Sequence, residues 1–288
     1  MNFALSFILH SFTMPTTRFA PSPTGLLHLG HAFAAGFAHR EALGGRFLVR
    51  LEDIDAIRTR PEFEVAIFED LAWLGLTWET PVRRQSEHFD DYRSALAKLE
   101  SLDLLYPCFC TRKDIQAEVT SAANAPQGPD GPLYPGICRN LSASERADRI
   151  ASGVAYALRL DVQRATTRLI KPLHWRDLDH GEFAATPEIF GDVVLARKET
   201  TASYHLAVVV DDALQDIDVV TRGEDLLPAT HLHRLLQHLL ELPVPLWRHH
   251  RLIVDEQGRR LAKRDNARSI RSLREAGMSS KVVWELCR

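Results

Sequence analysis

The sequence predicts an α/β protein built on a Rossmann-like parallel sheet, and two observations carry this prediction. Short apolar runs that end in turns alternate with segments whose apolar residues recur at helical spacing, and this β-α-β rhythm is typical of parallel sheets. The chain has 288 residues, 45% of them hydrophobic, which suffices for one large domain with insertions or for two moderate domains. We therefore expect an α/β body that is interrupted by an inserted segment.

The N-terminal third of the chain contains two strand-loop-helix units and a further helix. A short strand at Thr17–Ala20 leads through the turn Pro21–Gly25 into a helix rich in small residues. A second strand, Arg46–Leu51, leads past Pro61 into another helix. The expected helical faces consist of Ala32, Ala34, Ala35 and Ala38, then Phe63, Ile67, Leu71 and Leu74, and finally Phe89, Tyr92, Leu96 and Leu99.

The rest of the chain departs from this rhythm and then resumes it. A stretch rich in glycine and proline at residues 125–136 indicates an insertion, to which we assign residues 106–190. Further strands are expected at Val193–Ala196, His205–Val210, Val219–Thr221 and His250–Val254, with a helix at His231–Leu240. The predicted organisation is an N-terminal extension (1–16), two halves of a Rossmann-like domain (17–105 and 191–245), the insertion, and a loop with a short helical tail (246–288).

The N-terminus and the cysteines indicate a cytoplasmic protein. Residues 1–13 are apolar but lack the positive segment and the small-residue cleavage site of a signal peptide, and Met14 is an alternative start. No stretch reaches the roughly 20 apolar residues needed to span a bilayer, so no membrane association is expected. Three of the four cysteines cluster, which favours a reducing compartment and a metal site over a disulfide scaffold.

The charge balance excludes a strongly basic nucleic-acid-binding protein but leaves room for a local RNA surface. The 35 basic and 38 acidic residues give a net charge of −3. Between Arg248 and Arg274, however, nine Lys or Arg face three acids, a local charge of +6. Arg268 and Arg271 are the candidate phosphate contacts, although a solvated charged helix is the ordinary interpretation of such residues.

The tetrad His28-Leu29-Gly30-His31 lies where a strand-derived loop becomes a helix. Small residues there allow close backbone approach, and the first N–H groups of the helix suit an anion. Two imidazoles three residues apart can donate hydrogen bonds to phosphate oxygens. Two histidines at this spacing, with no further motif, are more often ordinary surface residues of a helix. A zinc site is disfavoured because no third ligand lies at a customary spacing.

The run Arg18-Phe-Ala-Pro-Ser-Pro-Thr-Gly25, followed by this tetrad, resembles the glutamate and glutamine branch of class I aminoacyl-tRNA synthetases. That class carries a tetrad written HIGH and a later loop written KMSKS, which here has the form Arg260-Leu-Ala-Lys263-Arg264. Only Lys263 is unchanged, at the position that reaches the ATP phosphates in the family, and Gly258 permits a mobile loop. The resemblance spans residues 17–266 and includes Tyr204–Asp212 and Thr221–Asp225.

The resemblance implies a site for glutamate and ATP. Glutamate needs cations for its two carboxylates and an anion for its ammonium group, because an unpaired charge in a pocket costs several kcal/mol. The ordinary alternative makes Arg222 and Glu52 ion-pair partners and Tyr204 a half-buried strand aromatic. By resemblance, glutamate is bound by Arg18, Ala20, Ser22, Glu52, Tyr204 and Arg222; ATP, with Mg²⁺, is bound by His28, Gly30, His31 and Lys263; and catalysis falls to His28, His31 and Lys263.

Cys108, Cys110 and Cys138 suggest a metal centre. Three thiolates complete a tetrahedral zinc site only with a fourth donor, and Cys287 lies far away in sequence. The arrangement resembles short glutamate-activating members of the branch, which implies one structural Zn²⁺ held by Cys108, Cys110, Tyr134 and Cys138. Water or another side chain is an alternative fourth donor, and three reduced, buried cysteines are the alternative to a metal.

The expected activity follows from the resemblance to these short paralogues. Only 25 residues follow Lys263, where a full-length synthetase continues into an anticodon-reading domain. The short paralogues activate L-glutamate with ATP and transfer it to the queuosine base in the anticodon loop of tRNA(Asp). We expect the same of this chain, as a monomer with no protein partner. The alternatives are a truncated glutamyl-tRNA synthetase that charges tRNA(Glu), and a non-catalytic glutamate, nucleotide or RNA-binding paralogue, against which the tetrad and Lys263 argue.

Overall fold

The computed structural model describes residues 14–121, 127–197, 201–254 and 268–287. Its strands are β1 (Thr17–Phe19), β2 (Phe47–Leu51), β3 (Glu79–Arg84), β4 (Leu105–Cys108), β5 (Gln127–Gly128), β6 (Gly131–Pro132), β7 (Ala157–Leu160), β8 (His174–Asp177), β9 (Gly181–Ala184), β10 (Val194–Arg197), β11 (Val219–Gly223) and β12 (Leu246–His250). Its α-helices are α1 (Leu29–Glu41), α2 (Pro61–Trp73), α3 (Phe89–Ser101), α4 (Arg112–Ser121), α5 (Ala143–Ala151), α6 (Val162–Thr167), α7 (Tyr204–Leu214), α8 (Ala229–Leu240), α9 (Ile270–Glu275) and α10 (Ser280–Leu286). None of the helices described is long and apolar enough to cross a lipid bilayer.

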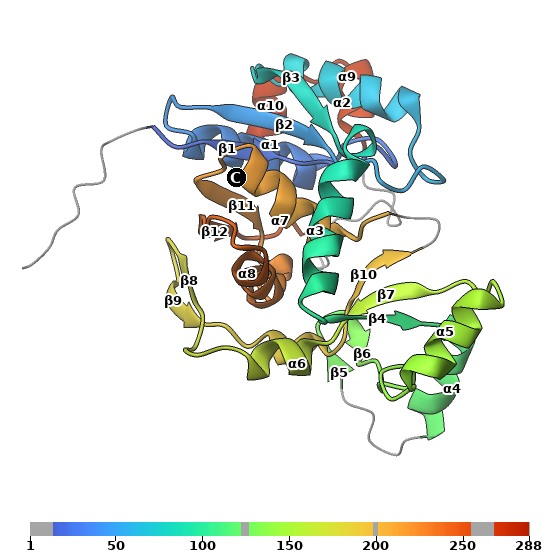
Figure 1. The fold of residues 1–288 in the computed structure, drawn as a ribbon. Coiled ribbons are helices and arrows are strands. Elements are labelled where there is room, and N and C mark those ends of the chain that lie inside the picture. The colour runs from blue at the N-terminus through green and yellow to red at the C-terminus, as the bar shows by residue number, and fades with distance from the viewer. Residues whose placement is uncertain (1–13, 122–126, 198–200, 255–267, 288) are drawn as a thin grey trace, which may run out of the picture.

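The main sheet is parallel apart from one edge hairpin. Strands β1, β2 and β3 pair in parallel, and so do β11, β12 and β8, while β9 is antiparallel to β8. The Thr16 carbonyl accepts the backbone N–H groups of Asp218 and Val219, at 3.0 and 3.2 Å, so β11 lies beside β1. The two sheets, in the orders β3-β2-β1 and β11-β12-β8-β9, therefore adjoin at β1 and β11 and form one layer (Figure 1). The direction of winding reverses between β1 and β11, and ligands bind at such switch points in open α/β sheets.

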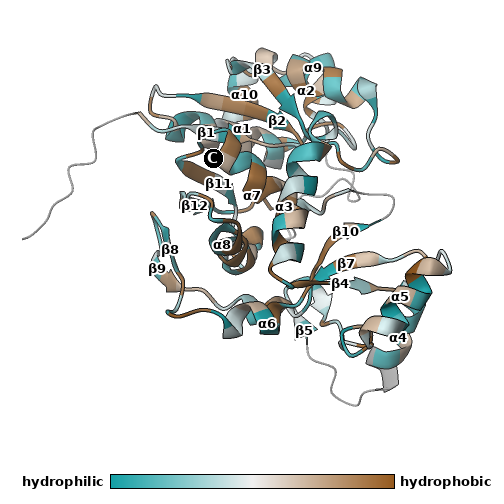
Figure 2. Cartoon of the chain, viewed as in Figure 1, coloured by the Kyte–Doolittle hydropathy of each residue, from teal (hydrophilic) through white to brown (hydrophobic). Residues whose placement is uncertain are grey.

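Two apolar cores hold the helices on this sheet. Small residues of α1, among them Ala32, Ala35 and Ala38, are at most 1% exposed and let the helix approach β1 and β11 closely. On the other side, α3, α7 and α8 share a second core. Figure 2 shows α7 as largely apolar, whereas α5, in the inserted segment, is largely hydrophilic. The expected α/β class with a parallel sheet is confirmed.

The insertion forms a lobe of its own. Strands β4, β7 and β10 make an antiparallel sheet in the order β10-β7-β4, and α4 and α5 lie in the same lobe (Figure 1). Helix α3 leads into this sheet at Leu105. Strands β8 and β9, from the second half of the predicted insertion, instead pair next to β12 and return the chain to the main sheet.

Two predicted strands are wrong. Residues Tyr204–Leu214 form helix α7, not a strand over His205–Val210. Residues 206–212 are buried without interruption, so the apolar run lacks the period of an amphipathic helix and its valines favour a strand. The predicted strand His250–Val254 lies at Leu246–His250, because its partner β11 ends at Gly223, which pairs with His250.

Candidate active site

The predicted site residues gather at the carboxyl ends of β1 and β11, where the sheet changes direction. A cavity of about 230 Å³ opens there between the start of α1, the end of β11 and the first turn of α7. A neighbouring cavity of about 290 Å³ shares Glu52 and Tyr204 with it and is also lined by Ser22. The first cavity is lined by Arg18, Ala20, His28, Gly30, His31, Glu52, Tyr204 and Arg222 from the predicted set.

The histidine tetrad begins helix α1 in a way that fixes both imidazoles. His28 is the N-cap, and its Nδ1 accepts the N–H of Gly30 at 3.1 Å, while Nδ1 of His31 accepts the N–H of His28 at 3.2 Å. In the neutral rings the proton is then on Nε2, so each ring carries a donor on its outer nitrogen. A Cβ at Gly30 would lie 3.0 Å from Cε1 of His28, so a larger residue there would displace the His28 ring. The arrangement places donors and a helix N-terminus at one end of the cavity.

Arg222, on β11, is a buried cation surrounded by neutral groups. Arg222 is 6% exposed. Its Nε donates to Nε2 of His249 at 3.2 Å and its Nη1 to Nδ1 of His233 at 3.1 Å. Its Nη2 donates to Oγ1 of Thr230 at 2.5 Å. No carboxylate of the described residues lies within ion-pair distance of the guanidinium. Burial lowers the pKa of Arg222. An anion entering the cavity would therefore be strongly attracted.

Arg18, in contrast, already has an anionic partner. Its Nε and Nη2 donate to the two carboxylate oxygens of Asp212 at 2.9 and 3.3 Å, and its Nη1 donates to the carbonyl of Thr221. Asp212 also accepts from Arg50 at 2.8 Å. Asp212 lies within α7, so this buried network ties α7 to β1 and β2. Arg18 is thus held rigidly against the cavity wall.

Glu52 is one of two carboxylate side chains, with Asp225, that line the cavity. Its side chain is 14% exposed and lies 4.0 Å from Nη2 of Arg50. Burial raises the pKa of Glu52 to about 7, against Arg50 and Arg18, which lower it. A cationic group bound beside Glu52 would favour the ionised form. Tyr204, whose pKa is raised by burial, contributes its hydroxyl from the first turn of α7.

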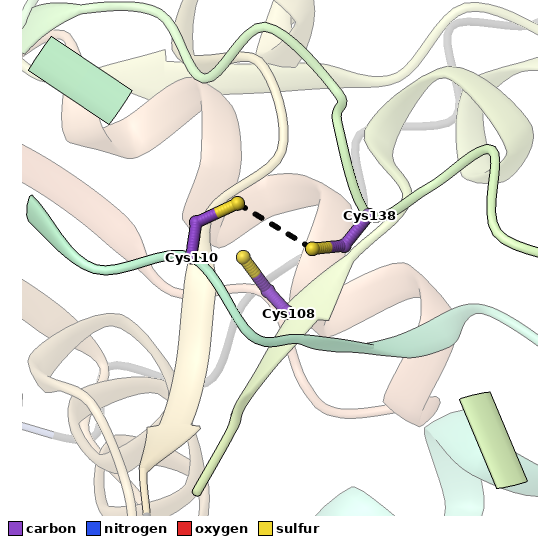
Figure 3. A group of neighbouring side chains, drawn as sticks. All are labelled: Cys108, Cys110 and Cys138. Carbon is purple, nitrogen blue, oxygen red and sulfur yellow. Dashed lines mark hydrogen bonds between the residues drawn. The ribbon is translucent and has the colours of Figure 1, made fainter. Parts of the chain in front are cut away.

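Three cysteines of the insertion converge on one point (Figure 3). Their Sγ atoms all lie within 4.8 Å of one another, and those of Cys110 and Cys138 are 3.4 Å apart. The Tyr134 hydroxyl oxygen lies 3.4 and 3.5 Å from the Sγ atoms of Cys108 and Cys110 and accepts the N–H of Cys138 at 2.8 Å. All four cysteines of the chain are free thiols, and this cluster could hold a metal ion such as zinc.

The ends of the predicted basic cluster are engaged within the protein. Arg248 pairs with Glu41 and Asp179. Arg271 and Arg274 both pair with Glu69, at 3.2 and 3.3 Å, and so fasten α9 to α2. These pairs make Arg271 a poorer phosphate contact than its exposed neighbour Arg268. The predicted ATP-binding Lys263, with the rest of its motif, lies outside the described residues.

Several residues of the site could not have been found from the motifs. His233 comes from the middle of α8 and His249 from β12, and both are buried against Arg222. His249 in turn contacts the buried Asp177 of β8 through Nδ1, at 2.7 Å. A single histidine in a strand or helix carries no spacing signal. The doublet His249-His250 at the end of a strand was the one available sign.

The site thus places three groups around one cavity: the buried Arg222, the partly buried carboxylate of Glu52, and a helix N-terminus that can bind phosphate. This combination can bind a small zwitterion with an additional carboxylate next to a nucleotide. The catalytic-domain profile of the class I tRNA synthetases for glutamate and glutamine matches residues 15–288. The crystal structure of a glutamate tRNA ligase from Elizabethkingia meningosepticum in complex with its amino acid is similar, with a TM-score of 0.73 and 29% identity over 88% of this chain and 52% of that one.

Sequence relatives narrow the family further. A glutamyl-Q tRNA(Asp) synthetase of Rhodobacter capsulatus is 50% identical over 94% of this chain and 98% of that protein, and one of Nocardia farcinica is 43% identical over 93% and 82%. A glutamate–tRNA ligase of Aquifex aeolicus is 39% identical over 94% of this chain but 56% of its own length. The chain belongs to the glutamate and glutamine family of class I tRNA synthetases and, within it, to the glutamyl-Q tRNA(Asp) synthetases.

Proposed function

We propose that this protein activates L-glutamate with ATP and transfers it to the queuosine base in the anticodon loop of tRNA(Asp). The observation that carries the proposal is Arg222, a buried cation that contacts only neutral groups among the described residues. It lies in one cavity with Glu52 and the histidine-capped start of α1. The Rhodobacter and Nocardia relatives support the acceptor assignment.

Each charge of glutamate has a partner in the cavity. Glu52 accepts the ammonium group, and Arg222 takes the side-chain carboxylate. The α-carboxylate loses its charge when it becomes the adenylate, so the cation without a partner suits the carboxylate that keeps its charge throughout. Arg18, whose charge Asp212 offsets, completes the donors together with Ser22, the Tyr204 hydroxyl and the backbone at Ala20.

Activation is an in-line displacement at the α-phosphate. An oxygen of the glutamate α-carboxylate forms a bond to phosphorus while the bond to the bridging oxygen of pyrophosphate breaks. The Nε2–H groups of His28 and His31, with the N-terminus of α1, stabilise the charge that develops on the phosphates. Mg²⁺ enters with ATP, and Lys263, from outside the described residues, is the further donor that we propose.

Transfer requires no protein nucleophile. A hydroxyl of the modified base attacks the adenylate carbonyl, an ester bond forms, and AMP leaves with the electrons of the anhydride bond while the hydroxyl proton is released. The neighbouring cavity, which shares Glu52 and Tyr204 with the glutamate cavity, is the opening through which the base can approach. Arg268, exposed beyond the ATP loop, remains our candidate for a phosphate contact.

For the cysteine cluster we propose one structural Zn²⁺ with Tyr134 as the fourth ligand. Tetrahedral coordination with Zn–S of about 2.3 Å and Zn–O of about 2.0 Å places the oxygen about 3.5 Å from each sulfur. The Tyr134 oxygen lies 3.4 and 3.5 Å from the sulfurs of Cys108 and Cys110. Arg159 stacks on the Tyr134 ring at 3.8 Å, and its charge favours an anionic cluster. The ion would fasten β4 to the segment before α5.

The function is tested with an isolated anticodon stem-loop of tRNA(Asp) that contains queuosine and has no acceptor end. With ATP and labelled glutamate, we expect label on this fragment and none on the same fragment with guanosine in place of queuosine. Label only on full-length tRNA(Glu) with a free 3′ end would identify a truncated glutamyl-tRNA synthetase. Absence of pyrophosphate exchange with glutamate would leave a non-catalytic binding protein.

The pKa of Glu52 gives a second prediction. We expect the KM for glutamate to rise about tenfold per pH unit as the pH falls below 7, because protonation of Glu52 removes the partner of the ammonium group. The carboxylates and the ammonium group of glutamate do not titrate between pH 6 and 8. Initial rates of exchange over this range measure the effect. Glu52→Gln should bind glutamate weakly at every pH, and an unchanged pH profile in that variant would contradict the role.

A further inference from the structure

The groups around Arg222 form two relays of hydrogen bonds that end on its guanidinium. The first runs from Asp177 through His249, and the second runs from Asp130 and His205 through His233. His249, His233 and Asp177 are each at most 3% exposed. We call this group the Arg222 cage. His249 and His233, the two histidines that contact Arg222, lie outside the motifs on which the family resemblance rests.

In the first relay, Asp177 fixes the tautomer of His249. One carboxylate oxygen of Asp177 lies 2.7 Å from Nδ1 of His249 and also accepts that residue's backbone N–H. Although burial alone would raise it, hydrogen bonds from His249 and His180 lower the pKa of Asp177 to about 2, so the carboxylate is an acceptor. The proton of His249 is therefore on Nδ1, and the lone pair of Nε2 meets the Nε–H of Arg222.

In the second relay, the same logic applies to His233. Its Nδ1 accepts from Nη1 of Arg222, so its proton is on Nε2 and is donated to Nδ1 of His205 at 3.1 Å. The other nitrogen of His205 lies 3.5 Å from the carboxylate of Asp130. Burial and the Arg222 charge lower the pKa of His233 well below its usual value and that of His249 to about 4. Both imidazoles are neutral acceptors near neutral pH.

The cage leaves donors of the guanidinium for a ligand. A guanidinium has five N–H groups, and His249, His233 and Thr230 engage one on each nitrogen. The Tyr204 hydroxyl also contacts the guanidinium, so a ligand carboxylate would meet the remaining N–H donors together with this hydroxyl. The cage fixes the orientation of the guanidinium without pairing it directly with an anion, because Asp177 is one imidazole away from it and Asp130 is two imidazoles away.

We propose that His249 and His233 are positioning residues that hold Arg222 as a fixed, uncompensated cation and thereby select a side-chain carboxylate over the corresponding amide. This inference rests on the proposed function in taking glutamate as the substrate. The carboxylate of glutamate supplies the negative charge that no group of the cage places against the guanidinium. The amide of glutamine leaves the charge of Arg222 uncompensated and turns an N–H group toward other donors. An acid in place of either histidine would remove the basis of this discrimination.

The test is a matched pair of variants, His233→Glu and His233→Gln, which differ only in charge at this position. Pyrophosphate exchange is measured with glutamate and with glutamine. In His233→Glu we expect kcat/KM for glutamate to fall about 100-fold or more and the preference for glutamate over glutamine to fall at least about tenfold. His233→Gln, which keeps a neutral acceptor, should retain the preference, and the KM for ATP should stay within about twofold in both. His238→Gln, exposed on the same helix, is the control.

The possible outcomes distinguish a failure of the proposed function from a failure of the proposed role of the cage. Failure of the wild-type protein to activate glutamate contradicts the proposed function, whereas equal preferences in the two variants overturn the cage. Nitrogen NMR of the histidine rings in the unmodified protein gives a readout that does not depend on how a variant folds. We expect His249 as the Nδ1–H tautomer and His233 as the Nε2–H tautomer at pH 6.5. The opposite tautomer or an imidazolium at either position refutes the proposal.

Discussion

Arg222→Met is expected to lower kcat/KM for glutamate in pyrophosphate exchange by a factor equivalent to about 3 to 5 kcal/mol of transition-state stabilisation. This is the cost of leaving a buried charge without its partner. In the variant the substrate's side-chain carboxylate would enter a cavity with no cation to receive it, while Glu52 would still hold the ammonium group. The loss should fall mainly on the KM for glutamate, and the KM for ATP should change little.

Two comparisons sharpen this expectation. Arg222→Lys keeps a charge but loses the planar fork and the donor to His249, so we expect it to recover only a small part of the activity. Arg46→Met removes an exposed arginine, paired with Glu79, at the opposite end of the strands and should leave exchange unchanged. Exchange by Arg222→Met within tenfold of the wild-type rate at low glutamate would show that Arg222 does not bind the glutamate side chain.

The sequence could predict the part of the site that lies in contiguous motifs. Arg18, His28 and Arg222 stand at strand ends or a helix start, where neighbouring parallel strands bring them to one edge of the sheet. The residues that orient them could not be predicted in this way. Asp177 and His249 are 72 positions apart, and only the parallel pairing of β8 with β12 brings them together.

The errors have physical causes of the same kind. The run that forms α7 is buried on every side, so neither its period nor its composition distinguishes a helix from a buried strand. The ion pair of Arg271, the predicted RNA contact, could not be expected from the sequence either, because its partner Glu69 lies on a helix some two hundred residues earlier. The cysteine cluster is easier to predict from the sequence than these contacts, because Cys108 and Cys110 are close in sequence and tetrahedral coordination limits the choice of donors.

Cys110→Ser is expected to reduce the metal content of the purified protein from about one zinc per chain to a small fraction of that, and to destabilise the insertion by several kcal/mol. Without the ion, burial raises the pKa of Cys110 to about 12, so the thiol is protonated and the cluster contributes only weak contacts. Metal analysis and thermal unfolding measure the two effects. Cys287→Ser is the matched control, because Cys287 is also buried but lies near the Leu29 carbonyl, away from the cluster.

Tyr134→Phe tests the fourth ligand more narrowly, because it removes one oxygen and keeps the ring on which Arg159 stacks. If the phenol oxygen completes the tetrahedron, the variant should release zinc to a chelator at least about tenfold faster while the three thiolates still hold the ion. Its thermal stability should fall between those of the wild-type protein and Cys110→Ser. Release at the wild-type rate would mean that water or another side chain is the fourth donor, and the 3.4 and 3.5 Å approaches of the oxygen to Cys108 and Cys110 would then reflect packing alone.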